Sequence, residues 1–179
     1  MVGYGGAGIA LWAHQVTGGA PVRLLTVHMA ICFSVDSVTA EAFGGRLCLA
    51  VLLDTITGRQ SARIVGDNLP VARYGSNSAR LRRTHMHMLL GDSIAAVIGQ
   101  GWRTQWYAVR NALNTEAHRL AAAGSSIARN TVRTCGLQSG RVDIFVTVDM
   151  CAVASGRSLL CCKMGWHTAA LPASFNSGG

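Results

Sequence analysis

The order of strand-like and helix-like segments constrains the fold of this chain more than any other feature. Short apolar runs, and runs in which apolar and polar residues alternate, favour strands. Apolar residues at a helical spacing favour helices. Along residues 5–123 the two patterns alternate, which is typical of an α/β domain with a sheet covered by helices. The expected elements are a hairpin at 5–33, a helix from about 36 to 54, a strand at 62–65, a short helix ending at 74, a helix at 84–98, a strand at 102–110 and a helix at 114–123.

The pattern changes after Gly124. Residues 124–140 are predicted to be a linker with one or two helical turns. The β-branched run at 142–148 is the strongest strand signal in the chain. The sequence therefore predicts a domain at 1–123, a linker at 124–140, and a C-terminal strand and tail at 141–179 that either complete the same domain or extend it.

The positive charge of the chain comes almost entirely from arginine. The formal net charge is +8, and Lys163 is the only lysine. Eleven arginines lie between residues 59 and 133, opposed there by three acidic residues. This clustering favours an acidic partner, usually nucleic acid, although a GC-rich genome would also raise the arginine total. The candidate contacts to RNA or an RNA–DNA hybrid lie in a polar turn and beside an aromatic run: Arg80, Arg82, Arg83, Arg103 and Arg110.

Composition excludes several classes of protein. Half of the residues are apolar and only 13% are charged, so the chain is not a disordered tail. No uncharged apolar run reaches the roughly 18 residues that a membrane span needs, and no basic segment precedes an apolar run as in a secretory signal. The six cysteines show no zinc-site spacing. We expect reduced cysteines and an intracellular location, with a mitochondrion or another organelle as one setting.

Three local motifs on the expected elements resemble the ribonuclease H family. They are T-A-E-A at 39–42, I-V-G-D-N at 64–68 and N-T-E-A-H-R-L-A at 114–121. The sequence around Asp67, with the arginines that follow it, is most similar to retroelement polyprotein versions. The resemblance covers about residues 5–123 and implies an α/β fold, with a mixed five-stranded sheet flanked by helices.

The resemblance also implies a metal site. The family hydrolyses phosphodiesters with two Mg²⁺ (or Mn²⁺) ions held by four carboxylates from separate elements, because oxygen ligands suit these ions. Glu41 and Asp67 match two of the four, whereas His118 replaces a third and is a poor Mg²⁺ ligand. Three plainer interpretations stay open. Glu41 would be a first-turn acid, Asp67 a helix cap and His118 a helix-surface residue.

The family's first strand, which carries Asp-Gly-Ser, is missing from the N-terminus of this chain. A sheet that loses its central strand exposes unpaired backbone groups. Our hypothesis is a circular permutation in which 142–148 fills the vacant position and brings Asp149 to Glu41 and Asp67. In the alternative, 142–148 is an edge strand, and the gap is filled by a partner chain or left open.

Three functions follow from these observations. The favoured one is a non-catalytic ribonuclease H-like module, retained as a basic, nucleic-acid-binding subunit of a larger assembly such as an organellar ribosome. The second is a working nuclease that cuts the RNA strand of RNA–DNA hybrids with Glu41, Asp67 and Asp149. The third is a protein–protein subunit that does not contact nucleic acid.

Overall fold

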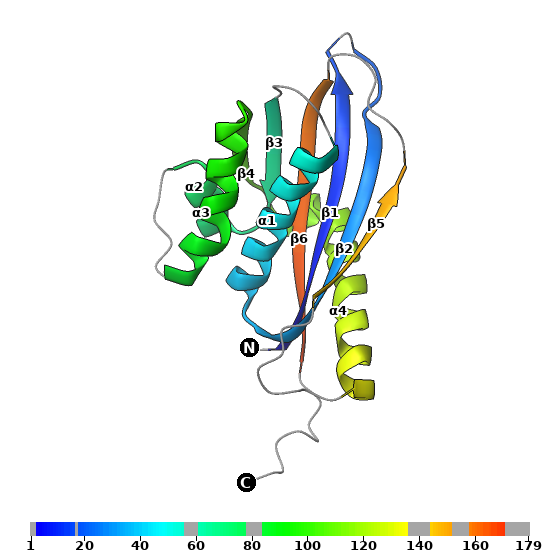
Figure 1. Ribbon diagram of the computed structural model, residues 1–179. Coiled ribbons are helices and arrows are strands. Elements are labelled where there is room, and N and C mark those ends of the chain that lie inside the picture. The colour runs from blue at the N-terminus through cyan, green and yellow to red at the C-terminus, as the bar shows by residue number, and fades with distance from the viewer. Residues whose placement is uncertain are drawn as a thin grey trace.

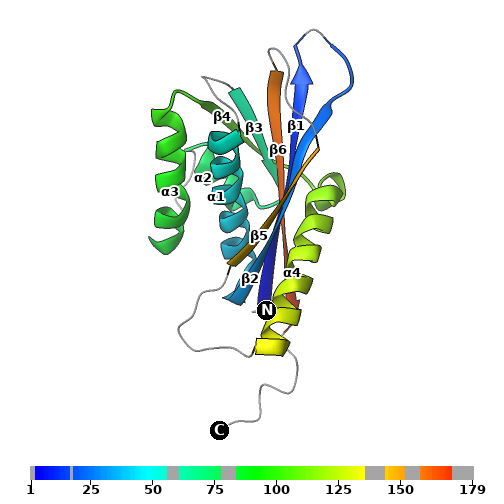
Figure 2. The same cartoon turned by 45° about the vertical axis from the view of Figure 1, so that its right-hand side comes forward.

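The computed structural model of the chain describes residues 3–16, 18–55, 61–77, 84–135, 144–151 and 158–170. One mixed sheet lies between helices on both of its faces (Figures 1 and 2). In chain order the elements are β1 (Gly3–Gln15), β2 (Val22–Val35), α1 (Ser37–Thr55), β3 (Ser61–Gly66), α2 (Leu69–Gly75), α3 (Thr84–Gly99), β4 (Arg103–Ala108), the 3-10 turn η1 (Asn111–Leu113), α4 (Thr115–Cys135), β5 (Ile144–Met150) and β6 (Ser158–Ala170).

The sheet has the strand order β4-β3-β6-β1-β2-β5. β1 pairs antiparallel with both β2 and β6, and β5 pairs antiparallel with β2. β3 runs parallel to both β4 and β6. The predicted fold class, a mixed sheet flanked by helices, is confirmed. The sheet has six strands in the described chain where five were expected.

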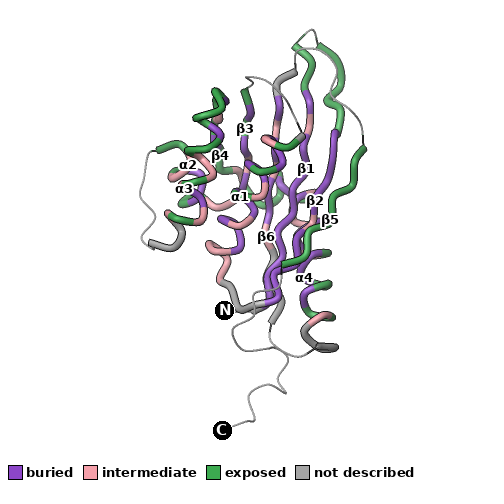
Figure 3. The backbone as a smooth tube through the Cα atoms, viewed as in Figure 1, coloured by how far each residue is buried: buried purple, intermediate pink, exposed green. Residues whose placement is uncertain are grey.

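The central strand of the sheet is β6. It lies between β1 and β3, the position that we expected residues 142–148 to fill. That expectation is wrong, because β5 lies at the sheet edge beside β2 and is exposed along its whole length (Figure 3). A β-branched run reports strand propensity rather than burial. β6 is instead rich in small and apolar residues, which suit a strand between two others with Cys162 and Met164 buried towards α1.

The last helix is longer than its sequence pattern predicted. α4 continues through Gly124, where we expected it to end, as far as Cys135. A Cβ at Gly124 would lie 2.8 Å from the carbonyl carbon of Met29, so this glycine lets the helix lie against β2. Gly124 therefore allows close packing against β2 and does not end the helix. The predicted linker at 124–140 is therefore helical up to residue 135, and residues 136–140 and the tail at 171–179 lie outside the described residues.

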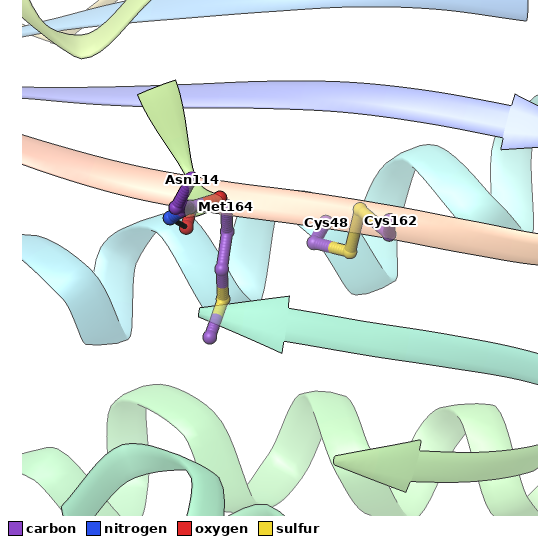
Figure 4. Close-up of a disulfide and its surroundings, with 4 residues drawn as sticks. All are labelled: Cys48, Asn114, Cys162 and Met164. Carbon is purple, nitrogen blue, oxygen red and sulfur yellow. Dashed lines mark hydrogen bonds between the residues drawn. A yellow bond between two sulfur atoms is a disulfide. The ribbon is translucent and has the colours of Figure 1, made fainter. Parts of the chain in front are cut away.

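The main core lies between the sheet and α1. Apolar side chains of α1 pack on the inner face of β6 and β1, and α3 packs on the outer side of α1. Cys48 of α1 and Cys162 of β6 form a disulfide within this core (Figure 4). The expectation of reduced cysteines is therefore wrong for this pair. None of the described helices is both long and apolar enough to cross a bilayer.

On the opposite face, α4 packs directly on backbone. Gly165 of β6 faces the first turns of α4, and a Cβ there would lie 2.8 Å from both the Ala117 carbonyl carbon and the His118 nitrogen. Gly6 and Gly8 of β1 meet the same helix in the same way. Glycine at these positions therefore sets how close α4 lies to the sheet.

We expect Gly165→Ala to lower the free energy of unfolding by roughly 1–3 kcal/mol, because the added methyl group must push α4 away from β6. The matched control is Gly99→Ala in α3, where no atom lies within 4 Å of the added carbon. That change should be neutral or stabilising by up to about 1 kcal/mol. Urea unfolding followed by circular dichroism measures both variants. Equal effects would contradict the role of Gly165 in helix packing.

Candidate functional site

Glu41 lies in the first half of α1, with its carboxyl group inside the protein. The residue is fully buried, and its Oε1 accepts a hydrogen bond of 2.9 Å from the backbone N–H of Asn68. Its other oxygen, Oε2, has no hydrogen-bond partner in the described part of the chain. Burial, and secondarily the neighbouring Asp67, raises the pKa of Glu41 from 4.5 to about 8. Glu41 is therefore mainly a neutral acid at pH 7.

Asp67 follows directly on β3 and lies beside Glu41. Its Oδ1 is 3.5 Å from Asn114 Nδ2, and its side chain is only 4% exposed. The next helix is capped by Asn68, whose side chain accepts a hydrogen bond from the Val71 N–H. The interpretation of Asp67 as a helix cap is therefore wrong. Asp67 instead points back towards the start of α4.

His118 comes from that start of α4 and faces Asp67. Its Nε2 lies 3.4 Å from Asp67 Oδ2, and its Nδ1 lies 3.3 Å from the carbonyl oxygen of Trp166. A proton on Nδ1 would be donated to that carbonyl, and a proton on Nε2 would point to the Asp67 carboxylate. The side chain is 24% exposed. His118 is therefore part of the Glu41–Asp67 cluster and not a simple helix-surface residue.

Met164 of β6 completes the cluster, and sequence reasoning did not find it. It is buried, and a Cβ built on Gly66 would lie 2.6 Å from Glu41 Oε1 and 2.8 Å from Met164 Cε. The carboxyl oxygen and the thioether methyl group thus meet at the same glycine. The Met164 carbonyl accepts a 2.6 Å hydrogen bond from Asn114 Nδ2 (Figure 4).

The position of Met164 in the fold is informative. β6 occupies the central position that the family's Asp-Gly-Ser strand was expected to hold, and it carries Met-Gly-Trp at 164–166. Gly165 is in close contact with α4, and the residue before it, Met164, is apolar where the expected motif has an aspartate before its glycine. Gly165 is the one residue that Met-Gly-Trp shares with Asp-Gly-Ser. A single glycine is too common to identify that motif in a sequence.

The other predicted residues lie elsewhere. Asp149 is paired with Thr26 on the edge strand β5, and β2 and β1 separate it from β6. The structure therefore does not bring Asp149 to Glu41 and Asp67, and the predicted trio is wrong in that member. Arg103 and Arg110 are exposed at and just after β4. Three predicted contacts lie outside the described residues: Arg80, Arg82 and Arg83.

The cluster does not fit a pair of Mg²⁺ or Mn²⁺ ions. Hard cations need several oxygen ligands, whereas this cluster offers two carboxyl groups, those of Glu41 and Asp67, beside the His118 imidazole and the Met164 thioether. Among the described residues, no three His, Cys, Asp or Glu side chains are grouped so that they can hold a metal. The arrangement is a packed cluster of side chains between α1, β3, β6 and α4.

Comparisons with known proteins are sparse. No protein-family model matches the chain, and no curated protein matches it. Among solved structures, the chain is similar to the N-terminal RNase H domain of a Mycobacterium tuberculosis protein, solved as a fusion with maltose-binding protein. The identity is 18% and the TM-score 0.49, and the match covers 69% of this chain and 96% of the other.

The state of Glu41 predicts a pH dependence of stability. Its pKa is about 8 in the folded protein against an ordinary 4.5, so between these values the folded chain holds a proton that the unfolded chain has lost. Stability should therefore fall as pH rises from about 5 to about 8, by up to roughly 1.4 kcal/mol per pH unit. Urea unfolding across this range measures it.

Glu41→Gln keeps the shape of the side chain and cannot ionise, so its stability should be much less dependent on pH in this window. The matched control is Glu116→Gln, which removes a partly exposed carboxylate that pairs with Arg23. That variant should keep the pH dependence of the wild type. A Glu41→Gln profile parallel to the wild type would show that Glu41 is ionised in the folded protein.

Proposed function

We propose that this chain is a non-catalytic ribonuclease H-like module that binds nucleic acid as a basic subunit of a larger assembly. The observation that carries the proposal is Met164, a buried thioether side chain on the central strand β6 that meets Glu41 at Gly66. A buried thioether there is incompatible with two hard cations sharing that position.

The charge of the cluster supports the same conclusion. Two-metal hydrolysis depends on ionised carboxylates that neutralise the ions and hold them in place. Here the cluster holds two carboxyl groups, those of Glu41 and Asp67, and Asp67 faces His118. Two carboxyl groups are present where the family resemblance implies four.

Charge outside the cluster supports nucleic acid as the ligand. The net charge is +8, and Arg103 on β4 and Arg110 just after it are exposed. Arginine binds phosphate through a planar fork of donors, and such contacts give affinity without sequence preference. Our proposal includes RNA as the ligand, an origin in a retroelement, and an intracellular setting such as an organellar ribosome in a mitochondrion.

The edge strand β5 supports membership of an assembly. Its apolar side chains are exposed on both faces, and its outer edge presents unpaired backbone groups within the described structure. A monomer rarely keeps such a strand in contact with water. A protein partner at this edge would explain why the chain retains it.

The test uses a labelled RNA–DNA hybrid with Mg²⁺ or Mn²⁺, and an authentic ribonuclease H as the positive control. We expect the wild type to cut no faster than its Asp67→Asn variant. The same protein should bind single-stranded RNA, with an affinity that falls steeply between about 50 and about 200 mM salt, because phosphate contacts release counterions. Fluorescence anisotropy measures the binding.

Two results would overturn the proposal. Cutting that Asp67→Asn abolishes would establish an active nuclease that uses this site. Binding that is absent, or that is weak and independent of salt, would favour a protein–protein subunit. Co-purification from the native source would test the setting, since a ribosomal location requires ribosomal RNA and ribosomal proteins to accompany the chain.

A further inference from the structure

The sheet face that carries α4 is only partly covered by it. α4 begins at Thr115 beside Gly165, midway along β6, and packs against β6, β1 and β2. The other helices, α1, α2 and α3, lie on the opposite face (Figure 2). β3, β4 and the first half of β6 therefore present outward side chains on the side of α4.

The strand alternation identifies these side chains. In β3, Ala62 and Ile64 are buried towards α1, while Arg63 between them is exposed. In β4, Trp106 is buried in the same core, and its neighbours point the other way. We call the resulting surface the open face and define it by six residues: Trp12, Arg63, Arg103, Gln105, Tyr107 and Lys163.

The strand register places these residues close together. Arg63 lies opposite Gln105 on β4 and opposite Cys161 on β6, and Cys161 lies opposite Trp12 on β1. In the next row, Val65 lies between Tyr107 and Lys163. Since neighbouring strands are about 4.8 Å apart, these two rows form one continuous surface across four strands.

The open face is positively charged without compensation from its own strands. The described residues of β1, β3, β4 and β6 include no aspartate or glutamate, and Asp67, which directly follows β3, is 4% exposed and faces His118 of α4. Burial raises the pKa of the Cys161 thiol, whereas Lys163 and Arg63 act to lower it, which shows that both cations are near Cys161. The nearby Glu116, on α4, is engaged by Arg23 at 2.7 Å.

The open face also presents an aromatic ring. Tyr107 is 44% exposed, and its hydroxyl donates a 3.1 Å hydrogen bond to Gln105 Oε1. That bond favours a fixed ring position on the face. Trp12 is in contact with the Arg23 guanidinium, 5.9 Å from its ring centre, so Tyr107 is better placed to receive a ligand.

We propose that the open face binds single-stranded nucleic acid, with Arg63, Arg103 and Lys163 on phosphates and Tyr107 stacked on a base. The inference rests on the proposed function and assigns it a surface distinct from the Glu41–Asp67 cluster. A sheet that combines cations with an exposed ring suits a single strand, because unpaired bases offer their faces to stacking. Duplex bases are already stacked, which leaves Tyr107 without a role.

The first experiment removes two charges from the open face and compares the result with the same loss elsewhere. The test variant is Arg63→Gln/Arg103→Gln. The matched control is Arg46→Gln/Arg129→Gln, at exposed positions on α1 and α4. The probe is a fluorescein-labelled single-stranded RNA of about 12 nucleotides, a typical length for one binding module.

We expect the open-face variant to bind at least about tenfold more weakly than the wild type, and the control to change affinity less than about threefold. The slope of log affinity against log salt should become shallower by about 1.4 in the open-face variant, since each phosphate contact contributes about 0.7 on a single strand. Urea unfolding should give all proteins similar midpoints.

The second experiment tests stacking separately from charge. Tyr107→Leu should weaken single-strand binding by about fivefold or more, with an unchanged salt slope, because base stacking carries no counterion release. Tyr107→Phe keeps the ring and should retain most of the affinity. On a duplex RNA of the same sequence, Tyr107→Leu should have no effect.

The outcomes separate this inference from the proposed function. If the wild type binds but the two double variants weaken equally, the open face is not the binding surface, and the proposed function still stands. If Tyr107→Leu changes nothing, or weakens duplex and single strand alike, single-strand recognition is wrong. If the wild type does not bind RNA at all, both proposals fail.

Discussion

The structure depends on the hydrogen bonding of β6 along both of its edges. β6 joins the antiparallel hairpin of β1 and β2 to the parallel pair of β3 and β4. Without it the sheet would divide into two parts, each with an unpaired and buried edge, and buried backbone groups without partners are costly. The last described strand of the chain therefore completes the sheet that the first strand begins, and the Cys48–Cys162 disulfide links it to α1 as well.

The same strand determines the chemistry of the central cluster. Gly165 lets α4 approach β6, and this approach brings His118 and Asn114 to Asp67. Glycine contacts thus bring the backbone segments of the cluster together, while Met164 supplies a buried apolar side chain beside Glu41. Two glycines make the close contacts of the cluster: Gly165 lies against α4, and Gly66 lies against the side chains of Glu41 and Met164. The cluster does not hold the charge that a pair of hard cations needs. The surface that we propose for binding is therefore the open face, where Arg63 and Arg103 are exposed and the described residues of β1, β3, β4 and β6 include no acid.

Part of this site could be predicted from the sequence. Glu41, Asp67 and His118 were each identified by a short motif on an expected element, and the structure places all three together. Met164 was missed because Met-Gly-Trp shares only its glycine with the expected Asp-Gly-Ser motif. Asp149 was wrongly included because a strong strand signal was taken for a central strand, and propensity does not say which strand is buried. Gly124 was taken for a helix end, whereas it marks a close contact with β2.

The sequence by itself determined the local elements, the α/β class and the basic character of the chain, because helix and strand patterns and net charge depend on nearby residues or on a simple sum. Tertiary structure alone decided which strand is central, how far α4 runs, and which residue stands beside Glu41. These outcomes depend on backbone pairing between segments more than one hundred residues apart, as between β1 and β6. The sequence of one segment says little about such pairing, because the strand that pairs with it is far away in the chain.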